Sequence, residues 1–301
     1  MKIQVRANSH SYDVVIGKGV LRQSFESISS LMEKADQLIV LTDQNIWNAQ
    51  GDYFSSQMPM PYDVFIMPNG EAGKTFANFE AVHTFLLQKN CTRKSCIIAF
   101  GGGAVGDLAG FVSATFMRGI PFIQVPTTIL AHDSAVGGKT AINHPLGKNL
   151  IGAFYQPQIV IYDTNMLSTL PEVEIRSGMA EVVKHAMLSD EKWLHELLQL
   201  SYDKMTDEQL SMYLAKGIQV KASIVEQDET EQSVRMFLNL GHTYGHALEA
   251  AAGYGKLTHG ECVMIGLIYM LLLGEKEGTI SPEFINEFIQ FLHRNSYPLD
   301  A

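Results

Sequence analysis

The stretch Gly101-Gly102-Gly103-Ala104-Val105-Gly106-Asp107 follows directly after an apolar run at residues 95–100. An apolar run that leads into this glycine spacing predicts a buried strand, a tight turn and then a helix. Residues 101–106 fit the pattern GxGxxG, whose glycines let the backbone approach a pyrophosphate while the helix N-terminus attracts its charge. The same pattern suits a tight turn that binds nothing, so the motif alone leaves both interpretations open.

The surrounding sequence places this turn in an α/β domain. Short runs rich in β-branched residues alternate with helical patterns such as residues 76–89. The runs lie at residues 13–16, 38–41, 64–67, 96–100, 122–125 and 159–162. Alternation of this kind predicts a Rossmann-like domain with a mainly parallel sheet.

The strand signal stops after about Asp163, and Leu170-Pro171 opens a helical region. Apolar spacing near 3.6 residues recurs in five segments, at residues 172–188, 192–200, 208–226, 236–252 and 260–277. The sequence therefore predicts two domains, an α/β domain at residues 1–165 and an all-α domain at residues 166–301.

Bulk composition excludes several classes of protein. Hydrophobic residues make up 46% and charged residues 18%, which is typical of globular chains and argues against disorder. No apolar run approaches the roughly 20 residues of a membrane-spanning helix, and the N-terminus lacks the apolar core of a signal peptide. The net charge of −10 disfavours a nucleic-acid partner. Three cysteines without a CxxC pair indicate a reducing cytoplasm.

One feature departs from a standard dinucleotide-binding unit. Such a unit carries an acid about 20 residues after the glycines, where it binds a ribose. The run at residues 122–125 contains no acid, whereas Asp43 ends an earlier strand. A nucleotide therefore requires Asp43 as the ribose ligand, and the loop at residues 69–74 follows a further strand and is a candidate part of the same crevice.

A second motif suggests a metal. His242 and His246 are four residues apart on a predicted helix and share a face, and His259 opens the next helix. Zinc commonly takes histidine nitrogen and carboxylate oxygen, and Glu181 in an apolar helical segment is the natural acid. The alternative to a metal site is that these histidines have only a structural role and that Glu181 is exposed to solvent. Spacing alone does not say which histidines bind, and His242 with His246 is the simplest pair.

Cations cluster between the two motifs. Lys139 and Lys148 are flanked by glycines, which suggests close approach of backbone to a ligand, although most lysines are merely solvated. A group of cations in an acidic chain implies an anionic substrate carrying phosphate or carboxylate. The segment Gly137-Gly138-Lys139-Thr140 is no Walker A loop, because the first glycine of that motif is missing.

Taken together, these motifs resemble the 3-dehydroquinate synthase family over nearly the whole chain. The matching stretches are residues 101–111, Arg118-Gly119, Val125-Pro126-Thr127-Thr128, 136–145, 147–152, 179–184 and 239–247. The resemblance implies a site for one divalent metal, Zn²⁺ or Co²⁺, formed by Glu181, His242 and His259. This ligand set replaces the pair of His242 with His246 and leaves His246 for substrate or catalysis.

The resemblance also implies an NAD site and a site for an anionic sugar phosphate. NAD is expected to contact Asp43, Glu71, Lys74, Gly103, Ala104, Val105, Gly106, Asp107, Thr127, Thr128, Lys139, Lys148, Thr164, Leu167 and Thr169. Catalytic and substrate-binding groups are expected to be Asp133, Lys139, Lys148, Asn149, Lys184, Lys221, Arg235, Asn239 and His246, with Arg118 supplied by the other subunit of a homodimer.

The reaction implied is the second step of the shikimate pathway. 3-Deoxy-D-arabino-heptulosonate 7-phosphate becomes 3-dehydroquinate and phosphate through transient oxidation by NAD, phosphate elimination, reduction and intramolecular aldol closure. The alternatives are another sugar-phosphate cyclase, a metal-dependent polyol dehydrogenase and a nucleotide-binding protein without turnover. Family members continue past the position of Ala301, so the resemblance also predicts a chain that lacks the family's C-terminal segment.

Overall fold

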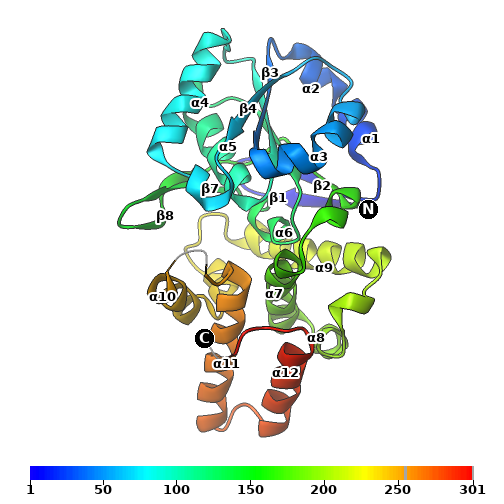
Figure 1. Ribbon diagram of the computed structural model, residues 1–301, viewed down its shortest axis with the longest axis vertical. Coiled ribbons are helices and arrows are strands. Elements are labelled where there is room, and N and C mark those ends of the chain that lie inside the picture. The colour runs from blue at the N-terminus through cyan, green and yellow to red at the C-terminus, as the bar shows by residue number, and fades with distance from the viewer. Residues whose placement is uncertain (254–255, 300–301) are drawn as a thin grey trace. The chain divides into compact units, whose positions relative to one another are not determined.

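The structure is a computed structural model that describes residues 1–253 and 256–299. The chain divides into two compact units, Met1–Thr169 and Leu170–Ala301. Residues 300 and 301, at the end of the predicted helical domain, lie outside the described residues. The first unit contains strands β1 to β9 together with helices, and the described part of the second unit is helical (Figure 1).

The N-terminal unit combines a large sheet with helices. Its strands are β1 (Lys2–Arg6), β2 (Ser11–Gly17), β3 (Leu38–Asp43), β4 (Asp63–Met67), β5 (Cys96–Gly101), β6 (Phe122–Pro126), β7 (Lys139–His144), β8 (Gly147–Phe154) and β9 (Ile159–Asp163). Its helices are α1 (Leu21–Ser27), α2 (Ser29–Lys34), α3 (Gln44–Gln57), α4 (Phe76–Gln88), α5 (Gly103–Thr115) and α6 (Ala131–Ser134), with 3-10 turns η1 (Gly70–Gly73), η2 (Phe116–Arg118) and η3 (Thr164–Thr169).

The seven-stranded sheet has the order β1-β2-β9-β6-β5-β3-β4, and only the pair β1–β2 is antiparallel. From β3 the chain runs through α3 outward to β4, whereas from β5 it runs through α5 in the opposite direction to β6. Right-handed crossovers in opposite directions place their helices on opposite faces of the sheet. The order therefore reverses between β3 and β5, where open α/β sheets bind ligands.

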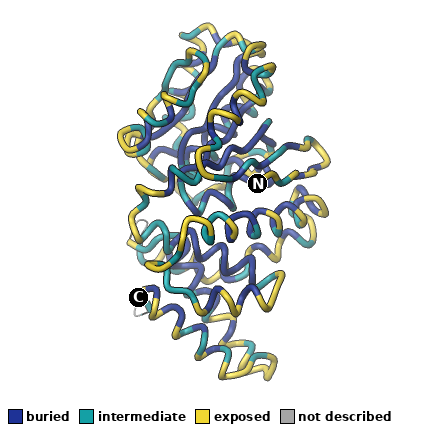
Figure 2. The backbone as a smooth tube through the Cα atoms, turned by 90° about the vertical axis from the view of Figure 1, so that its right-hand side faces the viewer, coloured by how far each residue is buried: buried dark blue, intermediate teal, exposed yellow. Residues whose placement is uncertain are grey.

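Two apolar cores cover the two faces of this sheet. One contains Val82 and Leu86 of α4 with Leu108 and Val112 of α5. The other contains residues of α1, α2 and α3, including Phe54, whose ring stacks on Phe100. Every residue of β3, β5, β6 and β9 is buried, as the dark strands of Figure 2 show. Strands that are buried on both faces read as continuous apolar runs, which explains why these were the easiest to predict.

Two regions of the N-terminal unit differ from the sequence-based prediction. The antiparallel hairpin β7–β8, which carries Lys139 and Lys148, was not among the predicted strands. Strand β8 lies on the surface and has no buried residue, so its sequence lacks a clear apolar alternation. Strand β1 was also missed, because its burial pattern leaves only Val5 fully buried.

The C-terminal unit is helical. It contains α7 (Glu172–Ser189), α8 (Glu191–Leu198), α9 (Asp207–Gln227), α10 (His242–Ala252), α11 (His259–Lys276) and α12 (Pro282–Arg294), with 3-10 turns η4 (Tyr202–Lys204) and η5 (Val234–Asn239). Helix α12, which the apolar spacing analysis missed, begins at the N-cap Ser281 with Pro282 in its first turn.

The predicted helix at residues 236–252 is wrong in one respect, because it is broken. Residues up to Asn239 form η5, and α10 begins only at His242. Between them Gly241 adopts φ +77°, a left-handed conformation that favours glycine and ends helical periodicity. A Cβ at this position would also lie 2.9 Å from the carbonyl oxygen of Val263. The break turns His242 into the first residue of a new helix.

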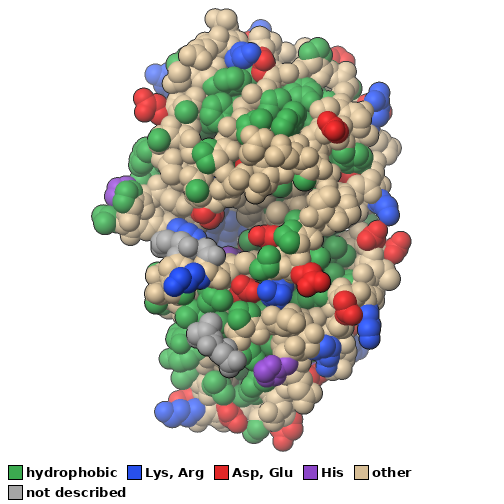
Figure 3. Space-filling model, in the orientation of Figure 1, with side chains coloured by type: hydrophobic (Ala, Val, Ile, Leu, Met, Phe, Trp, Pro, Cys, Tyr) green, Lys and Arg blue, Asp and Glu red, His purple; other side chains and the backbone are tan. Residues whose placement is uncertain are grey.

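The charge distribution, the helix lengths and the cysteines are consistent with what the composition indicated. On the face shown in Figure 3, Lys and Arg side chains are interspersed with Asp and Glu, without a continuous basic patch. Within residues 1–253 and 256–299 no helix is long and apolar enough to cross a membrane. The three cysteines are free and buried, so they form no disulfide framework.

Candidate functional site

Apart from Lys139 and Lys148, which lie on the separate β7–β8 hairpin, the residues predicted to bind NAD gather at one end of the large sheet. Asp43 ends β3 and caps α3, its Oδ1 accepting a hydrogen bond of 2.9 Å from the N–H of Ile46. The others lie after β4 (Glu71 and Lys74), after β5 (Gly103 to Asp107), after β6 (Thr127 and Thr128) and after β9 (Thr164, Leu167 and Thr169). These residues therefore follow the carboxyl ends of parallel strands, which is where open α/β sheets bind ligands.

The glycine-rich turn opens α5, with Gly102 as its N-cap and Gly103 as its first residue. The N–H groups of a first helical turn have no partners within the helix, and they carry the positive end of the helix dipole. Thr127 holds the neighbouring strand end in place, since its N–H donates to the carbonyl of Gly101 at 3.1 Å. This arrangement suits a pyrophosphate, as the sequence motif predicted.

A buried lysine connects this turn to the β7–β8 hairpin. The Nζ of Lys74 lies 2.7 Å from Oδ2 of Asp107, 2.6 Å from Oδ1 of Asn149 and 3.5 Å from Oε1 of Glu71. Asn143 completes the network by donating to Glu71 at 2.7 Å and accepting from the N–H of Asn149 at 3.0 Å. Burial alone would lower the pKa of Lys74, but the carboxylates of Asp107 and Glu71 raise it above its ordinary value.

We expect Lys74→Met to destabilise the protein by about 1.5–3 kcal/mol, because charge-assisted hydrogen bonds to Asp107 and Asn149 are lost around a nearly inaccessible side chain. Urea unfolding of the protein without ligands measures the effect. Lys89→Met is the matched control, since Lys89 pairs with Asp63 at 2.6 Å on the surface and such pairs contribute about 0–1 kcal/mol. Equal losses in the two variants would contradict the expectation.

The other predicted residues of the N-terminal unit lie on three elements. Lys139 begins β7, Lys148 and Asn149 lie on β8, and Asp133 lies on α6. Asn149 has φ +57°, a conformation that Asn tolerates better than most residues. Arg118 is exposed at the end of η2, and it and Met117 both have positive φ, +67° and +50°. Two such residues in succession are a strained arrangement of the kind found at functional sites.

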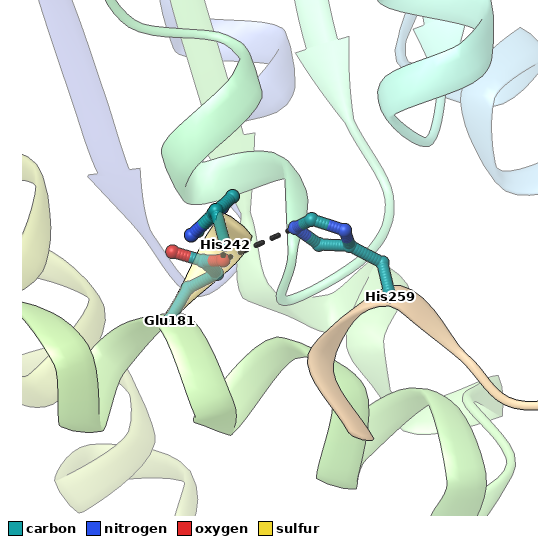
Figure 4. Close-up of side chains that lie close together, drawn as sticks. All are labelled: Glu181, His242 and His259. Carbon is teal, nitrogen blue, oxygen red and sulfur yellow. Dashed lines mark hydrogen bonds and ion pairs between the residues drawn. The ribbon is translucent and has the colours of Figure 1, made fainter. Parts of the chain in front are cut away.

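In the C-terminal unit, three helices bring a carboxylate and two imidazoles together. Glu181 lies in the middle of α7 with 1% of its side chain exposed, while His242 and His259 are the first residues of α10 and α11. Oε1 of Glu181 lies 3.2 Å from Nε2 of His259 and 3.5 Å from Nε2 of His242. Figure 4 shows both rings facing the carboxylate. One ligand atom from each residue lies within 4.8 Å of the others, a spacing that a metal ion can bridge.

Chemistry of the three donors fits a divalent metal. Nδ1 of His242 lies 3.1 Å from the carbonyl oxygen of Leu240, so this nitrogen carries the proton and Nε2 keeps its lone pair toward Glu181. Burial lowers the pKa of His242 to about 4 despite the opposing effect of Glu181, which keeps the ring in its neutral, metal-binding form at neutral pH. One carboxylate oxygen and two histidine nitrogens leave a coordination position for substrate.

Three further predicted residues of this unit lie on α7, α9 and α10. Lys184 is buried one turn after Glu181 and pairs with its Oε2, and Lys221 is buried on α9. His246 follows His242 by one turn of α10, with ring centroids 5.3 Å apart, and is exposed. The simple pairing of His242 with His246 therefore differs from the observed cluster, because the break at Gly241 directs His242 toward Glu181 and His259 instead.

Arg235 and Asn239 lie on η5, in a loop whose shape depends on a residue that the sequence analysis missed. The carboxylate of Asp228, at the end of α9, accepts hydrogen bonds from the N–H groups of Gln232, Ser233 and Arg235. Desolvation raises the pKa of Asp228, but these hydrogen bonds outweigh it and lower the pKa to about 2. An Asp directly after a helical pattern, with polar residues following, is a signal for such a turn.

Comparisons with known proteins agree on one family. Residues 64–177 match the sequence profile of the 3-dehydroquinate synthase N-terminal domain, and residues 178–301 match that of the C-terminal domain. The chain is 60% identical over 302 residues to the 3-dehydroquinate synthase of Lysinibacillus sphaericus (strain C3-41), covering 100% of this chain and 83% of the relative. It is 52% identical to that of Bacillus pumilus (strain SAFR-032), covering 93% and 78%.

A solved structure supports the same conclusion about the fold. The crystal structure of 2-deoxy-scyllo-inosose synthase complexed with carbaglucose-6-phosphate, NAD⁺ and Co²⁺ has a TM-score of 0.89 at 28% identity, covering 100% of this chain and 83% of that one. The fold class predicted from the sequence, a mainly parallel α/β part followed by a helical part, is confirmed. With both sequence profiles matched, the chain belongs to the 3-dehydroquinate synthase family.

Proposed function

We propose that this chain converts 3-deoxy-D-arabino-heptulosonate 7-phosphate to 3-dehydroquinate and inorganic phosphate, as a carbon–oxygen lyase of the shikimate pathway. Family membership carries the proposal, because the two profiles together span residues 64–301 and the relatives at 47–60% identity bear this name. The acidic composition and the three free cysteines support a cytoplasmic setting.

We assign NAD to the N-terminal unit and one divalent metal, Zn²⁺ or Co²⁺, to the C-terminal unit. When bound, NAD supplies a hydride acceptor and donor, and the metal polarises the alcohol that is oxidised. The turn at Gly103 to Asp107 would hold the pyrophosphate, and Asp43 a ribose. Glu181, His242 and His259 would hold the metal. The likeness to a synthase complexed with NAD⁺ and Co²⁺ supports both assignments.

The substrate carries a phosphate and a carboxylate, and we assign buried cations of the C-terminal unit to these groups. Lys184 and Lys221, which are both buried, provide charge that water screens poorly. Arg235 is 1% exposed. A guanidinium group can form bidentate hydrogen bonds with a phosphate. His246 is the candidate proton carrier, because its exposed imidazole lies beside His242 and histidine is the side chain that most often transfers protons in enzymes.

Lys148 offers a test of the substrate assignment. We expect Lys148→Ala to weaken substrate binding more than NAD binding, by a factor on the order of ten or more for the loss of one charge-assisted hydrogen bond. Lys148 lies on the hairpin β7–β8 rather than at the carboxyl edge of the large sheet. Calorimetric titration with each ligand checks the result, and equal loss of both affinities would argue against the assignment.

The reaction itself is tested by supplying the heptulosonate phosphate with NAD⁺ and Zn²⁺. Phosphate release without accumulation of NADH is the expected result, because each hydride taken is returned. A different carbocycle in the product mixture would favour another sugar-phosphate cyclase, for which the likeness to 2-deoxy-scyllo-inosose synthase is the specific observation. Net NADH formation from a simple polyol would instead favour a dehydrogenase.

We also propose a homodimer in which Arg118 reaches the site of the other subunit. The adjacent Met117 is 38% exposed, and the β7–β8 hairpin exposes further apolar side chains, namely Leu146, Leu150 and Phe154. Tyr155 ties the end of β8 to the segment after Arg118, since its hydroxyl donates to the carbonyl of Ile120 at 2.9 Å. Exposed apolar side chains of this kind are expected at a protein interface, and sedimentation equilibrium would detect the doubled mass.

A further inference from the structure

A second set of polar contacts joins two of the helices that carry the candidate metal ligands. Arg176 lies on α7, five positions before Glu181, and Glu261 lies on α11, two positions after His259. Nε and Nη2 of Arg176 donate to Oε1 of Glu261 at 2.9 and 2.7 Å. The glutamate side chain is 5% exposed and the arginine 18%, so the pair is largely shielded from water.

The other oxygen of Glu261 fixes the start of α11. Oε2 accepts hydrogen bonds from the N–H of Thr258 at 2.8 Å and from its hydroxyl at 2.9 Å. The N–H of Glu261 donates back to the threonine Oγ1, which completes a capping box. His259 is the residue directly after the cap, so the direction in which its imidazole leaves the helix depends on this box.

The backbone between cap and glutamate lies against α7. The N–H of Gly260 donates to Oγ of Ser177 at 3.2 Å, and a Cβ at Gly260 would lie only 2.0 Å from the carbonyl oxygen of Ser177. Residues 258–261 are therefore held to residues 176 and 177 by an ion pair, a hydrogen bond and direct backbone contact. One turn further along α7 stands Glu181, whose carboxylate faces His259.

We propose that Arg176 and Glu261 are positioning residues that set the separation of the metal ligands Glu181 and His259. The inference rests on the proposed metal site. Arg176 pulls the first turn of α11 onto α7, and Glu261 transmits that restraint through Thr258 to the histidine. Groups around a metal that orient its ligands typically alter affinity by about 10–100-fold when removed.

Packing alone does not account for this pair. Well-packed apolar residues can often replace a buried ion pair without loss of stability, so stability alone gives no reason for charges at these two positions. Burial and the nearby Glu261 carboxylate raise the pKa of Glu174, so a further carboxyl group stands close to Glu261. Without Arg176, the carboxylate of Glu261 would lie near the carboxyl group of Glu174 with no positive charge to balance it. The hydrogen bonds from Thr258 to Glu261 at the start of α11 would then weaken.

The test is Arg176→Met, which keeps an unbranched apolar stem and removes the guanidinium with its charge. We expect the affinity for Zn²⁺, measured by competition with a chromophoric chelator, to fall by about 10–100-fold. The visible absorption of bound Co²⁺ should shift, because it reports the geometry of the ligands. Arg176→Lys should restore part of the affinity, since it keeps the charge but lacks the planar fork.

Arg294→Met is the matched control. Arg294 donates to the carbonyl of Leu198 at 2.7 Å in the same unit, on α12, which carries none of the three ligands. We expect this control to change unfolding temperature and to leave Zn²⁺ affinity and the Co²⁺ spectrum unchanged. Arg176→Met with native affinity and spectrum would overturn the inference, whatever its stability. A parent protein that binds Zn²⁺ but releases no phosphate would count against the proposed reaction only.

Discussion

Replacing His259 with Ala should leave a folded protein that no longer retains its metal. The two remaining donors, Glu181 and His242, cannot form the three-ligand set that catalytic zinc sites use. Truncation at the partly exposed His259 removes little packing, since 30% of this side chain is accessible. Bound metal is therefore expected to fall from about one per chain to near zero after dialysis.

Elemental analysis of the dialysed protein measures this loss, and circular dichroism shows whether the fold persists. His246→Ala is the informative control, because its ring lies 5.3 Å from that of His242 but outside the cluster with Glu181. The control should keep its metal while losing phosphate release. Full metal occupancy in His259→Ala, or metal loss in His246→Ala, would show that the ligand set is assigned incorrectly.

A second consequence concerns thermal stability. Metal that binds only the folded state stabilises it by mass action, so the parent protein should melt at a higher temperature with added Zn²⁺. The His259→Ala variant should show little of this increase. If both proteins gain equally, the stabilising metal binds elsewhere.

The local sequence predicted those elements whose residues alone carry a clear pattern. Strands β3, β5, β6 and β9 are buried on both faces, so their apolar runs stand out without knowledge of their neighbours. The break before His242 was not visible in this way, because apolar spacing continues across Gly241. Only its left-handed conformation and its contact with Val263 show why a glycine stands there.

The candidate site was harder to predict than the fold because its contacts join residues far apart in the chain. Glu181 and His259 are separated by 78 positions, and no periodic pattern specifies that their helices meet. The resemblance of the motifs to a known family identified Glu181, His242 and His259 as metal ligands. The spacing of the histidines alone favoured His242 and His246 as the ligand pair. Arg176 gave no signal of its own. Glu261 did, since Thr258 and Glu261 have the spacing of a capping box before an apolar run.

Gly260→Ala should have the second large effect, through sterics rather than through loss of a ligand. The added methyl group would lie 2.0 Å from the carbonyl oxygen of Ser177 and 2.6 Å from its carbonyl carbon. These are backbone atoms in the interior of α7, so no side-chain rotation relieves the overlap. Either α11 moves away from α7 or the protein unfolds more readily, at a cost of about 1–3 kcal/mol or more.

Ser177→Ala separates this steric effect from loss of the hydrogen bond between the same two residues. It removes the acceptor of the 3.2 Å bond from Gly260 without adding any atom to the contact. We expect a loss of about 0.5–1.5 kcal/mol in urea unfolding for this control, with metal affinity retained. Gly260→Ala should lose more stability and bind Zn²⁺ more weakly, because moving α11 carries His259 away from Glu181. Native metal affinity together with native stability in Gly260→Ala would mean that the two helices can separate without disturbing the ligands, and that their close contact has no role in forming the metal site.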